Sequence, residues 1–116
     1  MKTALAVVTV MLLPAFVEAR AQQARIDRAK IDVKNLEKAV LAYKIKNGEF
    51  PESLAVLAQV QKDGSPAYLE KPLLRDPWDR PYQYEPNVVN QQTGYPLTYS
   101  QGPDPKDKKG YIRNWE

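Results

Sequence analysis

Few side chains in this sequence are able to carry out covalent or acid–base chemistry. It contains neither cysteine nor histidine, which excludes disulfides, thiol nucleophiles, Cys/His zinc sites and imidazole catalysis. The three serines, Ser53, Ser65 and Ser100, lack the histidine base that usually activates such a nucleophile. A chain of 116 residues also has room for only one hydrophobic core. These features argue against most classes of enzyme.

The one conspicuous carboxylate pair is Asp76 and Asp79, which flank Trp78. Paired carboxylates perform glycoside hydrolysis when a sugar ring fits between them. Here the neighbouring prolines favour a turn, and Arg80 is close enough in sequence to pair with an aspartate. We therefore interpret Asp76 and Pro77 as structural residues and predict that the protein is not an enzyme.

The elements that hold these residues follow from the distribution of proline. One proline is Pro14, none lies between residues 15 and 50, and nine follow from Pro51 onward. Because proline interrupts helices and favours turns, this predicts a long helix followed by a turn-rich half. The chain divides into an apolar segment at 1–21, an amphipathic helix at 22–48 and a globular half at 49–116.

The N-terminal segment is apolar but short. Ala4 to Val17 form 14 residues without a charge, and as a helix they extend about 21 Å, less than the ~30 Å core of a bilayer. In one interpretation, Lys2, this apolar run and the small residues around Arg20 form a secretory signal peptide. In the other, the run is the distal part of a longer membrane helix. Both interpretations place the following residues outside the cytoplasm.

An amphipathic helix is predicted from Glu18 to Lys46. Eight basic and four acidic residues occupy its polar faces, with Lys34, Glu37 and Lys38 at contact spacing. The charges alternate in sign, and the one aromatic residue of the segment, Tyr43, belongs to its apolar face, so we predict no binding to nucleic acid. Apolar residues recur every three or four positions and therefore share one face. They are Ile26, Ala29, Val33, Leu36, Val40 and Tyr43.

The ends of the helix have separate signals. Asn47 and Gly48 are expected to terminate it, and Pro51 prevents it from restarting. If the apolar segment continues into the helix, the whole rod has some 46 residues and a length of about 70 Å. A domain of this size cannot cover such a rod, so part of it must insert in a membrane or pack against copies of itself.

The C-terminal half predicts a short helix and a small antiparallel sheet. The helix is expected over 54–60, and the strands over 82–84, 97–100 and 111–113. Both tryptophans, Trp78 and Trp115, lie in this half, and we expect them to pack it onto the long helix. The predicted fold class is therefore α+β.

The order of these motifs resembles a known family. The chain is similar to the major pseudopilin of the bacterial type II secretion system, a member of the type IV pilin-like superfamily. The resemblance starts at about Pro14 and is most specific in Asn-Gly-Glu-Phe-Pro at 47–51, Asp-Pro-Trp at 76–78, Ser-Gln-Gly-Pro-Asp at 100–104 and Ile-Arg-Asn-Trp at 112–115.

The resemblance implies a pilin-like fold and a structural function. Such a subunit polymerises through its N-terminal helix into a helical homopolymer and helps to drive proteins across the outer membrane. Its implied partners are other copies, minor pseudopilins and an assembly platform in the inner membrane, with the globular half in the periplasm. The candidate assembly residues are Pro14, Glu18, Arg20, Arg25, Asp27, Arg28 and Asp32. The candidate structural residues are Asn47, Gly48, Pro51, Asp76, Pro77, Trp78, Asn114 and Trp115.

Two departures from the family stand out, and the first concerns the start of the chain. Pseudopilin precursors share a Gly-Phe-Thr-Leu-Ile-Glu block at which the leader is removed, and this sequence has no such block. We expect an upstream segment to be missing rather than replaced by a secretory peptide. The alternative function is a secreted or periplasmic pilin-like binding module that does not polymerise.

The second departure concerns metal. The resemblance implies a calcium ion in the C-terminal loop, for which Gln101, Asp104 and Asp107 are the candidate ligands. Calcium takes six to eight oxygen ligands with anionic charge, but lysines stand at 108 and 109 where the family has acids. The ligand set is incomplete, so we expect no cofactor. A lysine ammonium paired with Asp104 is the expected substitute for the ion.

Overall fold

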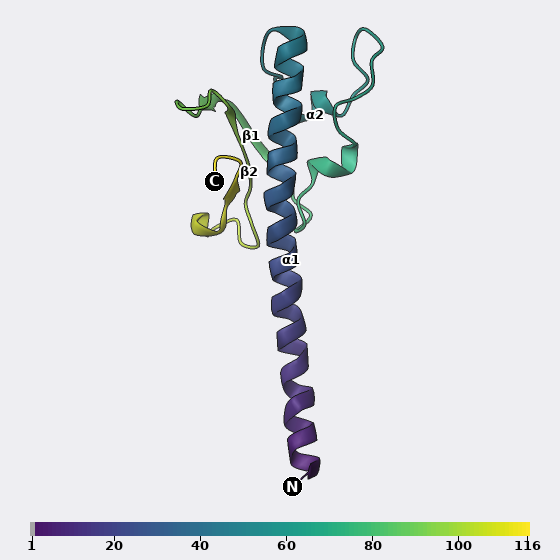
Figure 1. Cartoon of the computed structure of the whole chain (residues 1–116), viewed down its shortest axis with the longest axis vertical. Helices are drawn as coiled ribbons and strands as arrows, with labels where there is room; N and C mark the ends of the chain where they lie inside the picture. Colours follow the sequence, from purple (N-terminus) through teal and green to yellow (C-terminus); the bar gives the residue numbers. More distant parts are fainter. Residues whose placement is uncertain (1) are drawn as a thin grey trace.

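A single long helix sets the dimensions of the subunit. The computed structural model describes the backbone of residues 2–116 and the side chains from Pro14 onward. Helix α1 (Lys2–Asn47) runs without interruption, with Pro14 inside it (Figure 1). Its 46 residues correspond to roughly 69 Å of helix, and the molecule measures 71 × 32 × 20 Å.

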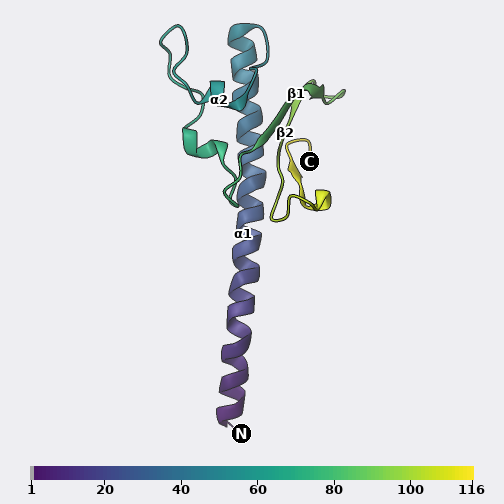
Figure 2. The same ribbon diagram turned by 180° about the vertical axis from the view of Figure 1, so that it is seen from behind.

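The rest of the chain forms a small head around the C-terminal half of α1. Helix α2 and the 3₁₀ helix η1 lie on one side of α1, and the sheet lies on the opposite side (Figures 1 and 2). This arrangement confirms the α+β, pilin-like fold. The elements are α2 (Leu54–Leu57), η1 (Lys71–Leu74), β1 (Gln83–Val89), β2 (Pro96–Ser100), η2 (Lys108–Gly110) and β3 (Ile112–Arg113).

The sheet is antiparallel, with strand order β1-β2-β3. Tyr84 pairs with Thr98, and Tyr99 pairs with Arg113. All three predicted strands are present, although β1 continues beyond the expected residues through an irregularity that follows Glu85. The short helix is briefer than predicted because the chain turns at Ala58, whose N–H donates to the Ala55 carbonyl.

The hydrophobic core lies between the apolar face of α1 and the head. The predicted helix stripe is confirmed, since its central residues are at most 1% exposed. Burying such aliphatic side chains contributes roughly 1.5–3 kcal/mol each, and this burial is what holds the head on the helix. The core residues are Ala29, Val33, Leu36, Ala39, Val40, Leu54, Leu57, Leu69, Tyr82 and Ile112.

The predicted end of the helix is also confirmed. Gly48 has a φ of +84°, in the left-handed region that glycine adopts at low cost. Its N–H donates to the Lys44 carbonyl over 2.7 Å, and the Asn47 side chain donates to the Tyr43 carbonyl. Pro51 follows as a buried residue. These contacts turn the chain back along the helix.

Candidate functional site

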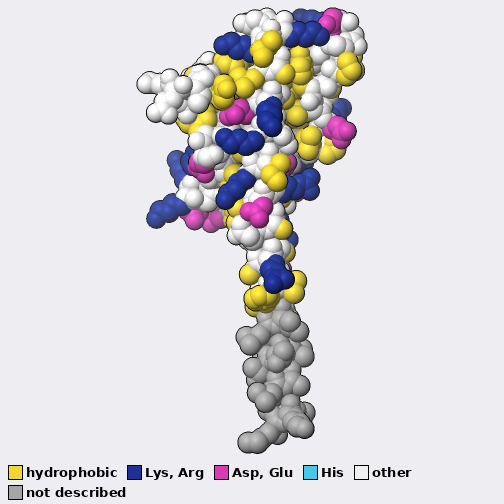
Figure 3. Space-filling model, in the orientation of Figure 1, with side chains coloured by type: hydrophobic (Ala, Val, Ile, Leu, Met, Phe, Trp, Pro, Cys, Tyr) yellow, Lys and Arg dark blue, Asp and Glu magenta, His cyan; other side chains and the backbone are white. Residues whose placement is uncertain are grey.

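The N-terminal part of α1 is bare where its side chains are first described. Residues 14–20 are all exposed, including Phe16 at 59% and Val17 at 61%. In Figure 3, apolar side chains gather at the base of the described surface, below the head. An exposed apolar patch rimmed by charge is typical of an interaction surface.

The candidate assembly charges pair with neighbours along the same helix. Arg25 lies 3.7 Å from Glu18, and the Arg20 guanidinium lies over the ring of Phe16. Asp27 accepts a hydrogen bond from Gln23 over 2.9 Å. Exposed contacts of this kind contribute little to stability. They can therefore be exchanged for contacts with another molecule at small cost.

Asp32 differs from the other candidate assembly residues, because it faces the head. Asp32 is only 7% exposed, and the Tyr82 hydroxyl donates a hydrogen bond to its carboxylate over 2.6 Å. Arg28 lies 3.8 Å from the same carboxylate. Asp32 thus fastens the head to α1 within one subunit and is not part of the exposed helix surface.

The Tyr82–Asp32 contact predicts a loss of stability at alkaline pH. Burial, reinforced by the bond to Asp32, raises the pKa of Tyr82 above its ordinary value. The unfolded chain releases this proton at about pH 10, whereas the folded chain retains it. The contribution of this proton to the free energy of unfolding is therefore complete below about pH 10. Above about pH 10 it falls, by up to about 1.4 kcal/mol per pH unit.

Urea unfolding between pH 8 and pH 11 tests this expectation. Tyr82→Phe should be less stable than the wild type at pH 8, and the difference should shrink as the pH rises above 10. Val40→Ala is the control, since it removes side-chain volume from the same core without removing a titratable group, and its difference from the wild type should not change with pH. Parallel curves for Tyr82→Phe and the wild type would show that the contact does not hold this proton.

Asn114 joins three elements at the centre of the head. It is fully buried, and its amide nitrogen donates to Glu37 on α1 over 2.7 Å and to the Pro96 carbonyl over 3.0 Å. Its side-chain oxygen accepts the Thr98 N–H over 2.8 Å, while Lys34 donates to its carbonyl. Lys34 and Glu37 therefore contact Asn114, and the intrahelical pairing predicted for them is not found among the described ion pairs.

The two tryptophans have different partners. Trp78 packs against the core and donates its indole N–H to Gln22 on α1 over 3.1 Å, which confirms that it binds the head to the helix. Trp115 donates instead to the Tyr95 carbonyl over 3.2 Å, a contact within the head. The expectation that Trp115 packs directly on the helix is not supported by its described contacts.

Asp76 organises the predicted turn. Its buried carboxylate accepts the main-chain N–H groups of Trp78 and Arg80 and the hydroxyl of Ser100. With three donors, this carboxylate is fully engaged in structure. The Arg80 side chain does not pair with Asp76; it extends to the carbonyls of residues 102 and 103.

The candidate calcium ligands contact their own loop. The Asp104 carboxylate accepts the Lys106 N–H over 3.0 Å, and the Asp107 carboxylate accepts the Lys109 N–H over 3.1 Å. Both aspartates are exposed, and Gln101 is half-buried. The described residues include no cluster of three or more potential metal-ligating side chains. The expected pair between Asp104 and a lysine ammonium is likewise not among their ion pairs.

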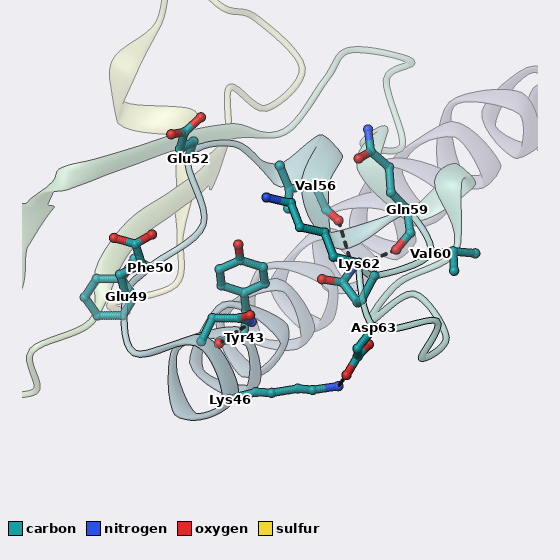
Figure 4. Close-up of a pocket in the computed structure, with 12 residues that line it drawn as sticks. Tyr43, Lys46, Glu49, Phe50, Glu52, Val56, Gln59, Val60, Lys62 and Asp63 are labelled. Carbon is teal, nitrogen blue, oxygen red and sulfur yellow. Dashed lines mark hydrogen bonds and ion pairs between the residues drawn. The ribbon is translucent and has the colours of Figure 1, made fainter.

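A hollow of about 640 Å³ lies between the end of α1 and the loop after α2 (Figure 4). The Lys46 ammonium lies 2.6 Å from the Asp63 carboxylate, and this hydrogen-bonded pair raises the pKa of Lys46 and lowers that of Asp63. Glu49 and Glu52 line the opposite side, as Figure 4 shows. The charged groups that line the hollow do not converge on a common point, which argues against catalytic chemistry there.

Comparison with known families identifies the chain. A family model described as type II secretion system (T2SS), protein G, matches residues 17–115. The chain belongs to this family. Pseudopilin subunits of this family are structural parts of the secretion system and not enzymes. Searches of curated proteins and of solved structures gave no match.

The match includes all of the head except its last residue, and most of the helix whose side chains are described. It confirms the identification as a major pseudopilin of the type II secretion system. Pseudopilins of this system are associated with the membrane and face the periplasm. In the portion of this chain that was searched, however, no helix combines the length and apolar character needed to cross a bilayer.

One of the contacts missed from the sequence had a detectable signal. Asp32 stands three residues after the buried Ala29 and four before Leu36, so it occupies the same helix face as the core. A charged residue at such a position indicates a buried polar partner. Arg80 gave no comparable signal, because its partners are main-chain carbonyls more than twenty residues away.

Proposed function

We propose that this pseudopilin polymerises through α1 into a pseudopilus that helps to drive proteins across the outer membrane. Its partners in this proposal are other copies of itself, minor pseudopilins and the assembly platform of the inner membrane. The observation that carries the proposal is the bare helix below the head, where residues 14–20 are all exposed.

The geometry favours a fibre with the helices inside and the heads outside. The head surrounds only the C-terminal half of α1, so apolar side chains such as Phe16 and Val17 need neighbouring helices to cover them. In the proposed fibre, each subunit uses one surface of its helix to contact the subunit before it and a different surface to contact the next. Such contacts between identical subunits do not close into a ring. They generate an open filament.

The absence of cysteine from the sequence gives a clean test. Phe16→Cys and Asp27→Cys, combined in one chain, place two thiols about 16 Å apart on a helix, too far for an internal disulfide. Oxidation in secreting cells should then yield a ladder of trimers and larger multimers. Each single variant is limited to a dimer and serves as the control.

Staggered, parallel helices are the arrangement that such a ladder requires. A double variant that stops at dimers or monomers, although it is expressed and folded, would contradict polymerisation through this surface. The non-polymerising binding module would then be the better description. The chain should be expressed from its own genomic context, so that any upstream leader is included.

A further inference from the structure

A positively charged side chain of the protein, that of Arg80, binds the main chain of the C-terminal loop, residues 101–111. Arg80 extends from the turn before β1 and donates from Nη1 to the Gly102 carbonyl over 2.6 Å and from Nη2 to the Pro103 carbonyl over 3.3 Å. A guanidinium is planar and permanently charged, so it can hold two successive carbonyls at once.

Arg80 is itself held in place by buried groups. Its main-chain N–H donates to the Asp76 carboxylate over 2.9 Å, and the same carboxylate accepts the Ser100 hydroxyl over 2.8 Å. The Ser100 oxygen in turn accepts the Gly102 N–H over 3.0 Å. Gly102 is therefore fixed through its N–H by Ser100 and through its carbonyl by Arg80.

The loop is poorly suited to a divalent cation. The carboxylates of Asp104 and Asp107 accept main-chain N–H groups, and the two aspartates are outnumbered by Lys106, Lys108 and Lys109. The loop alone thus has a formal charge of +1, and the Arg80 guanidinium adds another positive charge. Calcium requires anionic oxygen ligands to offset its own charge, and this donor set does not fit it.

We propose that the Arg80 guanidinium takes the place of a metal ion as the cation that closes the C-terminal loop. The conformation of the loop is then fixed by contacts within the protein, and calcium should not change its stability. This inference concerns the folded subunit and does not depend on polymerisation. The guanidinium binds the carbonyls of Gly102 and Pro103, and the hydrogen-bonded Asp76 and Ser100 side chains hold the main-chain N–H groups of Arg80 and Gly102.

The first test is amide hydrogen exchange in the full chain with Arg80→Met, which keeps the length of the side chain but removes its donors. Exchange at the amides of Asp107 and Gly110, which bond within the loop, should become about tenfold faster. Arg75→Met is the matched control. Arg75 also donates to a carbonyl, that of Asp79, but the contact stays within its own turn.

Equal acceleration by both variants, or none by Arg80→Met, would overturn the proposal. If Arg80→Met fails to fold, Arg80→Lys provides the second variant. Lysine keeps the charge but replaces the guanidinium fork with a compact ammonium, so it should restore only part of the protection.

The second test adds calcium to the wild type. Melting temperature and loop exchange should be the same with millimolar calcium and with a chelator. A rise of several degrees in melting temperature, or loop exchange slowed severalfold by calcium, would show that the loop binds the ion. Magnesium at the same concentration controls for a general effect of ionic strength. These readouts use monomeric protein, so they are independent of the cross-linking test of the pseudopilus.

Discussion

Asn114→Asp should destabilise the head by about 3–5 kcal/mol, more than most surface or core substitutions. The change is almost isosteric, but it replaces the donating amide nitrogen with a carboxylate oxygen. That oxygen would face the Glu37 carboxylate at 2.7 Å and the Pro96 carbonyl at 3.0 Å, with no proton between them. Two hydrogen bonds are lost, and a negative charge at the fully buried position 114 is brought against the carboxylate of the half-buried Glu37.

Urea unfolding of the single and double variants measures this effect. Glu37→Gln in the Asn114→Asp background restores a donor opposite the new carboxylate, so the double variant should be more stable than Asn114→Asp alone. Glu37→Gln by itself can turn its amide oxygen toward the Asn114 amide nitrogen, so it keeps a neutral hydrogen bond and should destabilise the head only slightly. If the two substitutions are simply additive, the Asn114–Glu37 bond does not couple the head to α1.

Gly102→Ala is the second substitution with a large expected effect. The glycine has a φ of +69°, and an added Cβ would lie 2.4 Å from the carbonyl oxygen of Gly110. The left-handed conformation alone costs an alanine about 1–2 kcal/mol. The clash with the main chain adds to this cost, because neither backbone segment can move freely. We expect a total loss of about 3–5 kcal/mol.

Gly94→Ala separates these two costs. Gly94 also has a positive φ, +76°, but nothing lies within 4 Å of an added Cβ. Its loss of stability in urea should match the conformational cost alone. Equal losses for Gly94→Ala and Gly102→Ala would show that the close approach of Gly102 to Gly110 is not rigid in solution.

The sequence was sufficient to predict the two α-helices and the three strands, though not the two 3₁₀ helices, because the signals for the former are local. The apolar stripe from Ile26 to Tyr43 defined the buried face of α1, and Asn47 with Gly48 defined its end. The alternation around Tyr82 and Tyr84 indicated β1, and the following strands were also anticipated. The boundary of α2 was less accurate, because the turn at Ala58 carries no proline or glycine.

The contacts between elements were much harder to predict. Glu37 had nearby lysines on its own helix, yet it bonds to Asn114, 77 residues later in the chain. A charged side chain on a helix always has such local partners within reach, so the pattern cannot reveal which one turns toward the head. The cation bound to the C-terminal loop was missed for a similar reason. The charged side chains of the loop favoured a lysine, whereas Arg80 binds main-chain carbonyls, which every residue possesses and which therefore leave no signal in the sequence.

The head is attached to α1 at several heights, and this has a mechanical consequence. Its contacts begin at Gln22, include Asp32 and Glu37, and continue to Lys46, a distance of about 36 Å along the helix. A force along the helix axis would load these contacts together, in shear, so that no single contact bears the whole force. A force pulling the head sideways would load them in turn, as in peeling. The subunit is thus built to resist axial thrust better than lateral pull.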